Sequence, residues 1–95
     1  MISILYVDDQ EELLDVGKRF LEKSGEISAD TCPLPDMVMN KIQQKSYDAI
    51  ISDYEMPGMD GLTLLKNIRN TGNTIPFIIF TGKGREEVVI EALNN

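Results

Sequence analysis

No histidine and no tryptophan occur in this sequence of 95 residues, and cysteine occurs once. Without an imidazole, the chain has no histidine general base, no histidine-ligated zinc and no phosphohistidine of its own. A single cysteine cannot form an internal disulfide, which is typical of a reducing compartment, so we expect a cytoplasmic location. We expect Cys32 to pack in the core rather than to react.

Basic residues and long apolar runs are also scarce. Nine Lys and Arg face sixteen Asp and Glu, for a net charge of −7, so binding to a nucleic-acid backbone is not expected. No apolar run approaches the roughly 18–20 residues that cross a bilayer. The apolar start, Met1–Val7, has no basic leader and is followed by two aspartates. It predicts a buried strand rather than a signal peptide, and no membrane partner is expected.

Short apolar runs alternate with segments of helical periodicity along the whole chain. The runs predict four strands, of which the last is the most apolar and is expected to be buried: Ile2–Val7, Ile27–Cys32, Tyr47–Asp53 and Pro76–Thr81. Helices are predicted around Leu13–Leu21, Met37–Ile42, Leu62–Ile68 and Val88–Leu93. This β–α alternation predicts one α/β domain with a doubly wound parallel sheet, flavodoxin-like, in the strand order 2-1-3-4.

Acidic side chains follow two of the predicted strands. Asp8 and Asp9 close the first strand and Asp53 closes the third, and these strands are neighbours in the flavodoxin-like order. At an effective dielectric of about 20, two such charges about 4 Å apart repel by about 4 kcal/mol. Raised pKa values, a buried lysine or a bound cation must offset this repulsion. Oxygen ligands with room for water suit Mg²⁺, beside which Asp53 can attack a phosphorus atom.

Thr81 ends the fourth predicted strand, and its hydroxyl is expected at the same corner. There it can donate to a phosphoryl oxygen and act as a switch. Each residue also has a simpler interpretation. Asp8 and Asp9 can cap the first helix, Asp53 can form an Asx turn, and Thr81 can be an ordinary strand hydroxyl. Their convergence from three separate strands favours a site over independent capping.

Three segments that carry these residues resemble the CheY-like receiver family of two-component signalling. They are residues 4–9, Ile-Leu-Tyr-Val-Asp-Asp; residues 47–62, Tyr-Asp-Ala-Ile-Ile-Ser-Asp-Tyr-Glu-Met-Pro-Gly-Met-Asp-Gly-Leu; and residues 75–82, Ile-Pro-Phe-Ile-Ile-Phe-Thr-Gly. The middle segment is highly specific, and the resemblance extends over the whole chain. It implies a response-regulator receiver domain of flavodoxin-like fold.

The resemblance also implies a role for each of these positions. Asp8 and Asp9 would serve a Mg²⁺ site, and Asp53 would be the phosphoacceptor beside it. Glu55 would lend its backbone carbonyl to the metal, and Thr81 would bind the phosphoryl group and couple it to a surface change. The implied partner is a sensor histidine kinase or a phosphotransfer protein. Transfer to Asp53 would be followed by autodephosphorylation, with no separate substrate.

The chain departs from the family in one respect. Receiver domains continue through a fifth strand and helix, whereas this sequence stops at Asn95, so residues 1–95 are expected to form a C-terminally incomplete domain. The phosphate-binding lysine that follows the fifth strand is absent. Lys83, in the loop after Thr81, is expected with Glu55 to tune dephosphorylation. The apolar fourth strand is expected to be an open edge that invites a homodimer or strand exchange.

Two other function classes compete with the phosphorylated switch. A degenerate receiver would keep the fold and act as a phosphorylation-independent interaction or dimerisation module, which the absent lysine favours and the retained aspartates oppose. A Mg²⁺-dependent phosphatase or phosphotransferase with an aspartyl intermediate usually needs an Asp-x-Asp pair and a cap. Position 55 is Glu, and no segment is long enough for a cap. The phosphorylated switch is therefore the leading hypothesis.

Overall fold

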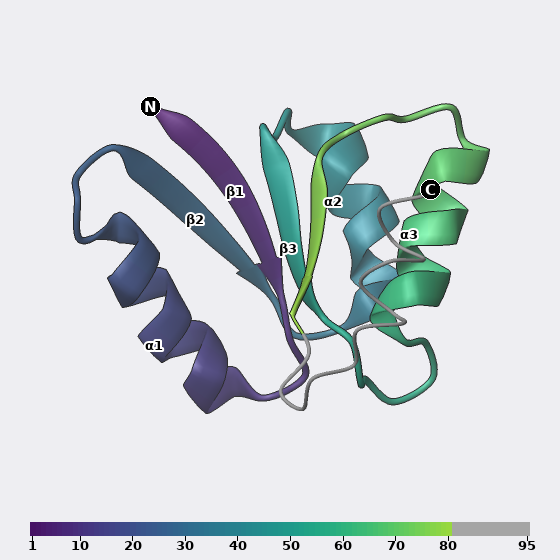
Figure 1. Cartoon of the computed structure of the whole chain (residues 1–95), viewed down its shortest axis with the longest axis horizontal. Helices are drawn as coiled ribbons and strands as arrows, with labels where there is room; N and C mark the ends of the chain where they lie inside the picture. The colour runs from purple at the N-terminus through teal and green to yellow at the C-terminus, as the bar shows by residue number, and fades with distance from the viewer. Residues whose placement is uncertain (81–95) are drawn as a thin grey trace.

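The computed structural model describes residues 1–80, which fold into a four-stranded sheet with helices on both faces (Figure 1). The strands are β1 (Ile2–Val7), β2 (Ile27–Cys32), β3 (Ala49–Asp53) and β4 (Phe77–Phe80). All pair in parallel, in the order β2-β1-β3-β4. The predicted fold class and strand order are therefore confirmed. Thr81, Lys83 and the predicted last helix lie outside the described residues.

The helices divide unequally between the two faces of the sheet. Helix α1 (Glu11–Glu22) packs on β1 and β2, whereas α2 (Val38–Gln44), preceded by the 3₁₀ turn Pro35–Met37, and α3 (Gly61–Asn70) lie on the opposite face (Figure 1). The main core fills the space under α2 and α3; its buried members are Leu5, Val7, Cys32, Val38, Ile50, Met56, Leu64 and Ile68. Burial of the Cys32 side chain agrees with its expected packing role. Among residues 1–80, no helix is long and apolar enough to cross a membrane.

The free edge of β2 is covered by side chains of α1. The carbonyls of Glu26 and Cys32 accept hydrogen bonds from the N–H groups of Ile2, in β1, and Asp8, directly after it, so the intervening Ala29 turns its backbone groups outward. Lys18 Nζ donates to the carbonyl oxygen of Ala29, and the Ala29 N–H donates to Glu22 Oε2 at 3.0 Å. Lys18 Nζ and Glu22 Oε2 also form a salt bridge with each other at 3.3 Å. This ion pair therefore occupies both hydrogen-bonding groups that the edge would offer another strand at this residue.

Strand β4 is more exposed than its apolar sequence predicts. The side chains of Ile78 and Phe80 are on the face that carries α1, and 54% and 63% of their surfaces are exposed. Because α1 packs on β1 and β2, no helix of the described part of the chain covers β4 on this face. The predicted burial of the fourth strand is therefore wrong for the face of β4 that carries Ile78 and Phe80. The expected open edge agrees with the position of β4 at the end of the sheet in residues 1–80.

The start of α3 closes against the backbone that carries Asp53. The Gly61 N–H donates to the Tyr54 carbonyl at 2.7 Å, and a Cβ atom on Gly61 would lie 2.5 Å from the carbonyl oxygen of Asp53. Asp60 caps the helix by accepting a hydrogen bond from the Thr63 N–H at 2.7 Å. Only glycine permits this approach, because any side chain would overlap the backbone at the end of β3.

Replacing Gly61 with alanine is therefore expected to push α3 away from β3. The cost in the free energy of unfolding should be about 1–3 kcal/mol, the usual range for an overpacked site. Urea unfolding measures it. Thr63→Ala, at an exposed position of the same helix, is the control and should change stability by less than about 0.5 kcal/mol. Equal stability of the two variants would contradict the proposed steric role of Gly61.

Candidate functional site

Three carboxylates meet at the carboxyl edge of the sheet. Asp8 and Asp9 follow β1 and Asp53 ends β3, and one oxygen of each lies within 4.8 Å of the others. We refer to these residues as the acidic cluster. Strands β1 and β3 pair directly, which brings their ends together. The predicted convergence of the three side chains is therefore present.

Asp8 is the most buried member of the acidic cluster. Its carboxylate accepts a hydrogen bond from the Gln10 N–H at 2.9 Å. Burial raises the pKa of Asp8, and the charges of Asp53 and Asp9 raise it further, whereas the Gln10 hydrogen bond opposes the shift. The N-cap residue of α1 is Gln10, and its side chain makes no capping bond. The hydrogen bond to Asp8 comes from the N–H of the N-cap residue itself, whereas a capping side chain accepts from an N–H inside the first turn of the helix. Helix capping therefore does not explain the position of Asp8 and Asp9.

Asp53 is held by the backbone of the loop that follows it. Its Oδ1 accepts a hydrogen bond from the Tyr54 N–H at 2.8 Å, as an aspartate that opens a turn does. Burial raises the pKa of Asp53, as do the charges of Asp9 and Glu55, while the N–H groups of Tyr54 and Glu55 oppose this. Asp53 therefore takes part in a local turn and also belongs to the acidic cluster. The turn directs the carboxylate, and neighbouring strands supply the charges around it.

Asp9 supplies the observation that points to a cation. Its Oδ1 is buried and has no hydrogen-bond partner among residues 1–80. An unpaired buried carboxylate oxygen is unfavourable unless a cation or a proton lies against it. The cluster offers oxygen ligands only, which suits a hard divalent ion such as Mg²⁺. The residues present therefore fit such an ion.

The structure says less about the two remaining predicted site residues, Glu55 and Thr81. Glu55 is exposed two residues beyond Asp53, and its N–H is directed at the Asp53 carboxylate. The use of its carbonyl as a metal ligand stays a prediction. Thr81 lies outside the described residues, so its role as a switch hydroxyl also stays a prediction.

Tyr6 is a neighbour of the site that the sequence pattern does not reveal. It lies on β1 in register with Ile51, which is two residues before Asp53. Its ring lies against α1, where a Cβ atom on Gly17 would be 2.2 Å from a ring carbon. Burial raises the pKa of Tyr6, and the charges of Asp8 and Asp53 raise it further. A glycine in the middle of α1 is the only sequence signal that a ring packs there.

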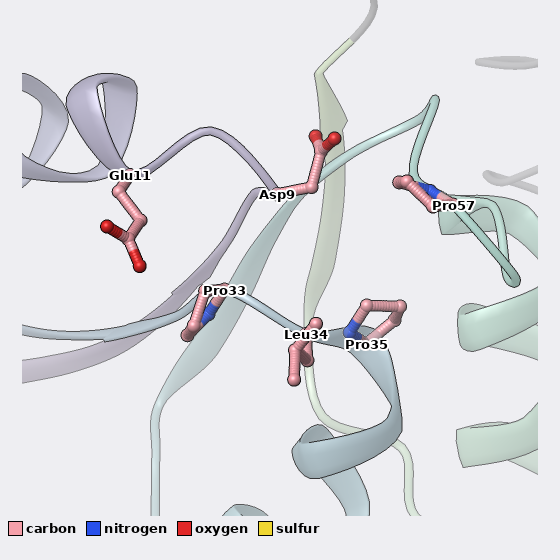
Figure 2. Close-up of a pocket in the computed structure, with 6 residues that line it drawn as sticks. All are labelled: Asp9, Glu11, Pro33, Leu34, Pro35 and Pro57. Carbon is pink, nitrogen blue, oxygen red and sulfur yellow. The ribbon is translucent and has the colours of Figure 1, made fainter.

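A shallow groove of about 370 Å³ borders the acidic cluster on the side of β2 (Figure 2). Its lining residues come from three segments that follow β1, β2 and β3: Asp9, Glu11, Pro33, Leu34, Pro35 and Pro57. We call this surface the proline groove. Asp9 belongs to both the groove and the acidic cluster, so the two surfaces are continuous.

Comparison with curated proteins finds similar sequences within longer regulatory proteins. A two-component response regulator of Arabidopsis thaliana named ARR13 is 37% identical over 91 residues, which cover 90% of this chain and 16% of the relative. The DNA-binding transcriptional regulator NtrC of Klebsiella pneumoniae is 35% identical over 86 residues, covering 90% of this chain and 18% of that protein. The chain therefore spans less than a fifth of the length of these relatives.

Solved structures of response regulators superpose closely on the chain. The receiver domain of the Francisella response regulator 1452 superposes with a TM-score of 0.89 at 29% identity, covering 99% of this chain and 77% of that one. The response regulator TrrA of Thermotoga maritima, solved in complex with Mg²⁺-BeF, gives a TM-score of 0.86 at 27% identity, covering 98% and 80%. The family model described as response regulator receiver domain matches residues 4–95. With a matching fold and an acidic cluster at the expected strand ends, the chain belongs to the response regulator receiver domain family.

Proposed function

We propose that this receiver domain accepts a phosphoryl group on Asp53 in a Mg²⁺-dependent reaction and thereby switches its contacts with other proteins. The convergence of the acidic cluster, with a buried and unpaired oxygen on Asp9, is the observation that carries the proposal. Burial raises the pKa values of Asp8 and Asp53, and the charges of the neighbouring acids raise them further. Such a site is most stable when a cation neutralises it.

Asp53 is the residue best placed to be the nucleophile. It ends β3 as a part-buried side chain, and the Tyr54 N–H fixes one oxygen. The other oxygen would attack phosphorus, and the P–N bond of a donor phosphohistidine would break. A bound Mg²⁺ supplies charge neutralisation for the incoming phosphoryl group. Asp8 and Asp9 would hold this ion with Asp53 and the backbone carbonyl of Glu55.

The donor in this proposal is a sensor histidine kinase or a phosphotransfer protein. The chain contains no histidine, so the phosphohistidine must belong to another protein. A location in the cytoplasm, where such donors would meet the domain, belongs to the same proposal. The domain acts on no separate substrate. Hydrolysis of its own phosphoaspartate would end the signal, tuned by Glu55 and Lys83, while Thr81 would bind the phosphoryl group.

Acetyl phosphate tests the phosphorylation directly. Incubation with Mg²⁺ should add one phosphoryl group to the chain, because a small donor needs only the nucleophile and the cation. Intact-mass spectrometry reads the adduct. Asp53→Asn and a metal-free sample are the controls, and both should stay unmodified. A folded wild-type chain that gains no adduct would contradict the proposal and favour an interaction-only domain.

The acidic cluster also predicts how Mg²⁺ affects stability at different pH. Since the folded pKa values of Asp8 and Asp53 are raised, the folded chain binds more protons than the unfolded chain between the ordinary and the raised pKa. These two groups therefore weaken metal-free folding as the pH rises through that window. Above it both are charged, and Mg²⁺ at a hundred times its Kd should add about 2.7 kcal/mol to the free energy of unfolding.

Urea unfolding with and without Mg²⁺ at pH 7 and at pH 4 measures this effect. The stabilisation should be present at pH 7 and weaken on acidification, because protonated carboxyl groups no longer bind the cation. Asp8→Asn is the control. It should abolish most of the Mg²⁺ effect at pH 7 and make the metal-free protein more stable, since one repulsive charge is lost. The same Mg²⁺ stabilisation in Asp8→Asn as in the wild type would exclude Asp8 as a ligand.

The exposed side of β4 favours a second candidate function, that of an interaction module that pairs through this strand. Ile78 and Phe80 present apolar surface beside an edge that has no cover in residues 1–80. The other edge, β2, is covered at Ala29 by Lys18 and Glu22. Association would therefore use the β4 edge, as a homodimer or by strand exchange.

Sedimentation over a range of protein concentrations tests this pairing. Ile78→Lys should lower the association constant by about tenfold or more, because it places a charge on the open edge. Lys18→Ala is the comparison, and it should leave pairing through β4 unchanged. A chain that stays monomeric at every concentration would rule out this second function. Phosphorylation-independent association, lost in Ile78→Lys, would support it.

A further inference from the structure

Strand β2 is the outermost strand of the sheet beside α1 (Figure 1). The carbonyls of Glu26 and Cys32 face β1 and accept hydrogen bonds there. Along a parallel strand, successive residues direct their N–H and C=O groups to opposite sides. The even-numbered residues of β2 are therefore bonded to β1, and the backbone groups of the odd-numbered residues point away from the sheet: Ile27, Ala29 and Thr31.

Two side chains of α1 cover the middle one of these three residues. Lys18 Nζ donates to the Ala29 carbonyl oxygen, the Ala29 N–H donates to Glu22 Oε2 at 3.0 Å, and Nζ and Oε2 lie 3.3 Å apart. We call Lys18 and Glu22 the edge latch. Their side chains are 42% and 35% exposed, so water competes for the same contacts and the edge latch can open without uncovering the core.

The outward groups of β2 are complementary to those of a second copy of the chain. In an antiparallel pairing about a two-fold axis at Ala29, this residue would pair with its own equivalent, and Ile27 would lie opposite Thr31 of the second copy. Residues paired in this way exchange both of their hydrogen bonds, so all three outward residues of each copy would be satisfied. A two-fold arrangement, in which the same strand serves both sides, is the commonest symmetry of dimers. The edge latch thus covers the residue on which the axis would lie.

The charges beside this edge are compatible with a second copy. The ends of Lys18 and Glu22 lie at Ala29, so the two-fold axis would place each of them next to the oppositely charged member of the other edge latch. On the other face of β2, Asp30 forms a salt bridge with Lys45 at 3.0 Å. This lysine neutralises the carboxylate, which reduces the repulsion between Asp30 and its equivalent in the second copy.

We propose that the edge latch keeps β2 closed in the single chain, and that the edge it covers pairs with β2 of a second copy when the latch opens. The two sheets would then be continuous across the pair. This inference goes beyond the proposed function, because it needs neither Mg²⁺ nor phosphorylation of Asp53. It also differs from pairing through β4, since β2 and β4 are at opposite ends of the sheet.

Sedimentation over a range of protein concentrations tests the inference in the full chain. The latch variant is Lys18→Met/Glu22→Met; both side chains are replaced, because either alone still covers one backbone group of Ala29. One base and one acid are lost, so the net charge is unchanged. Every variant also carries Ile78→Lys, which prevents pairing through β4 from contributing. At about 0.15 M salt, where long-range repulsion is screened, the latch variant should associate about tenfold or more strongly than Ile78→Lys alone.

Two matched variants give the controls. Asp15→Met/Arg19→Met removes an acid and a base that are also four residues apart on α1 and are exposed, and it should leave the association constant unchanged. Thr31→Pro, added to the latch variant, removes an outward N–H but no hydrogen bond to β1. Proline is tolerated at such an edge position, so the chain should stay folded and association should return to the value of Ile78→Lys alone. Circular dichroism confirms the fold of each variant.

Amide hydrogen exchange gives a second and site-specific measurement. In the latch variant, the N–H groups of Ile27, Ala29 and Thr31 should exchange slowly at high protein concentration and rapidly on dilution, because only the second copy protects them. An association constant equal to that of Ile78→Lys alone would overturn the inference. So would stronger association that persists with Thr31→Pro or that occurs equally in Asp15→Met/Arg19→Met. Exchange at these three N–H groups that does not change with concentration would overturn it even if Thr31→Pro fails to fold.

Discussion

The repulsion among three carboxylates at one edge of the sheet is the constraint on which the site depends. A parallel pairing of β1 and β3 brings Asp8, Asp9 and Asp53 within 4.8 Å of one another, and no lysine or arginine of residues 1–80 forms a salt bridge with them. Burial raises the pKa values of Asp8 and Asp53, and the charges of the neighbouring acids raise them further, so charging these carboxylates opposes folding when no cation is bound. In the proposed function, a cation would lower this repulsion and a phosphoryl group would add negative charge to the same edge.

The structure holds the acidic cluster in place with backbone groups. N–H groups of Gln10 and Tyr54 bind Asp8 and Asp53, and the close approach of Gly61 fixes the chain at the end of β3. Backbone donors orient a carboxylate while leaving its net charge for a cation to neutralise. An arginine at the same place would satisfy the acids permanently and remove the need for an ion. Local, uncharged donors thus leave the charge of these carboxylates available to the cation of the proposed function.

Much of the fold and the acidic cluster could be predicted from the sequence because both follow from short-range patterns. Apolar runs of β-strand length give the strands, and acids at the ends of the first and third meet once the strands are neighbours. The packing of Tyr6 against Gly17 could not be predicted, since it depends on where α1 crosses the sheet. The exposure of Ile78 was missed for a related reason. An apolar side chain tends to be buried, but its actual burial depends on whether a helix packs against its face of the sheet.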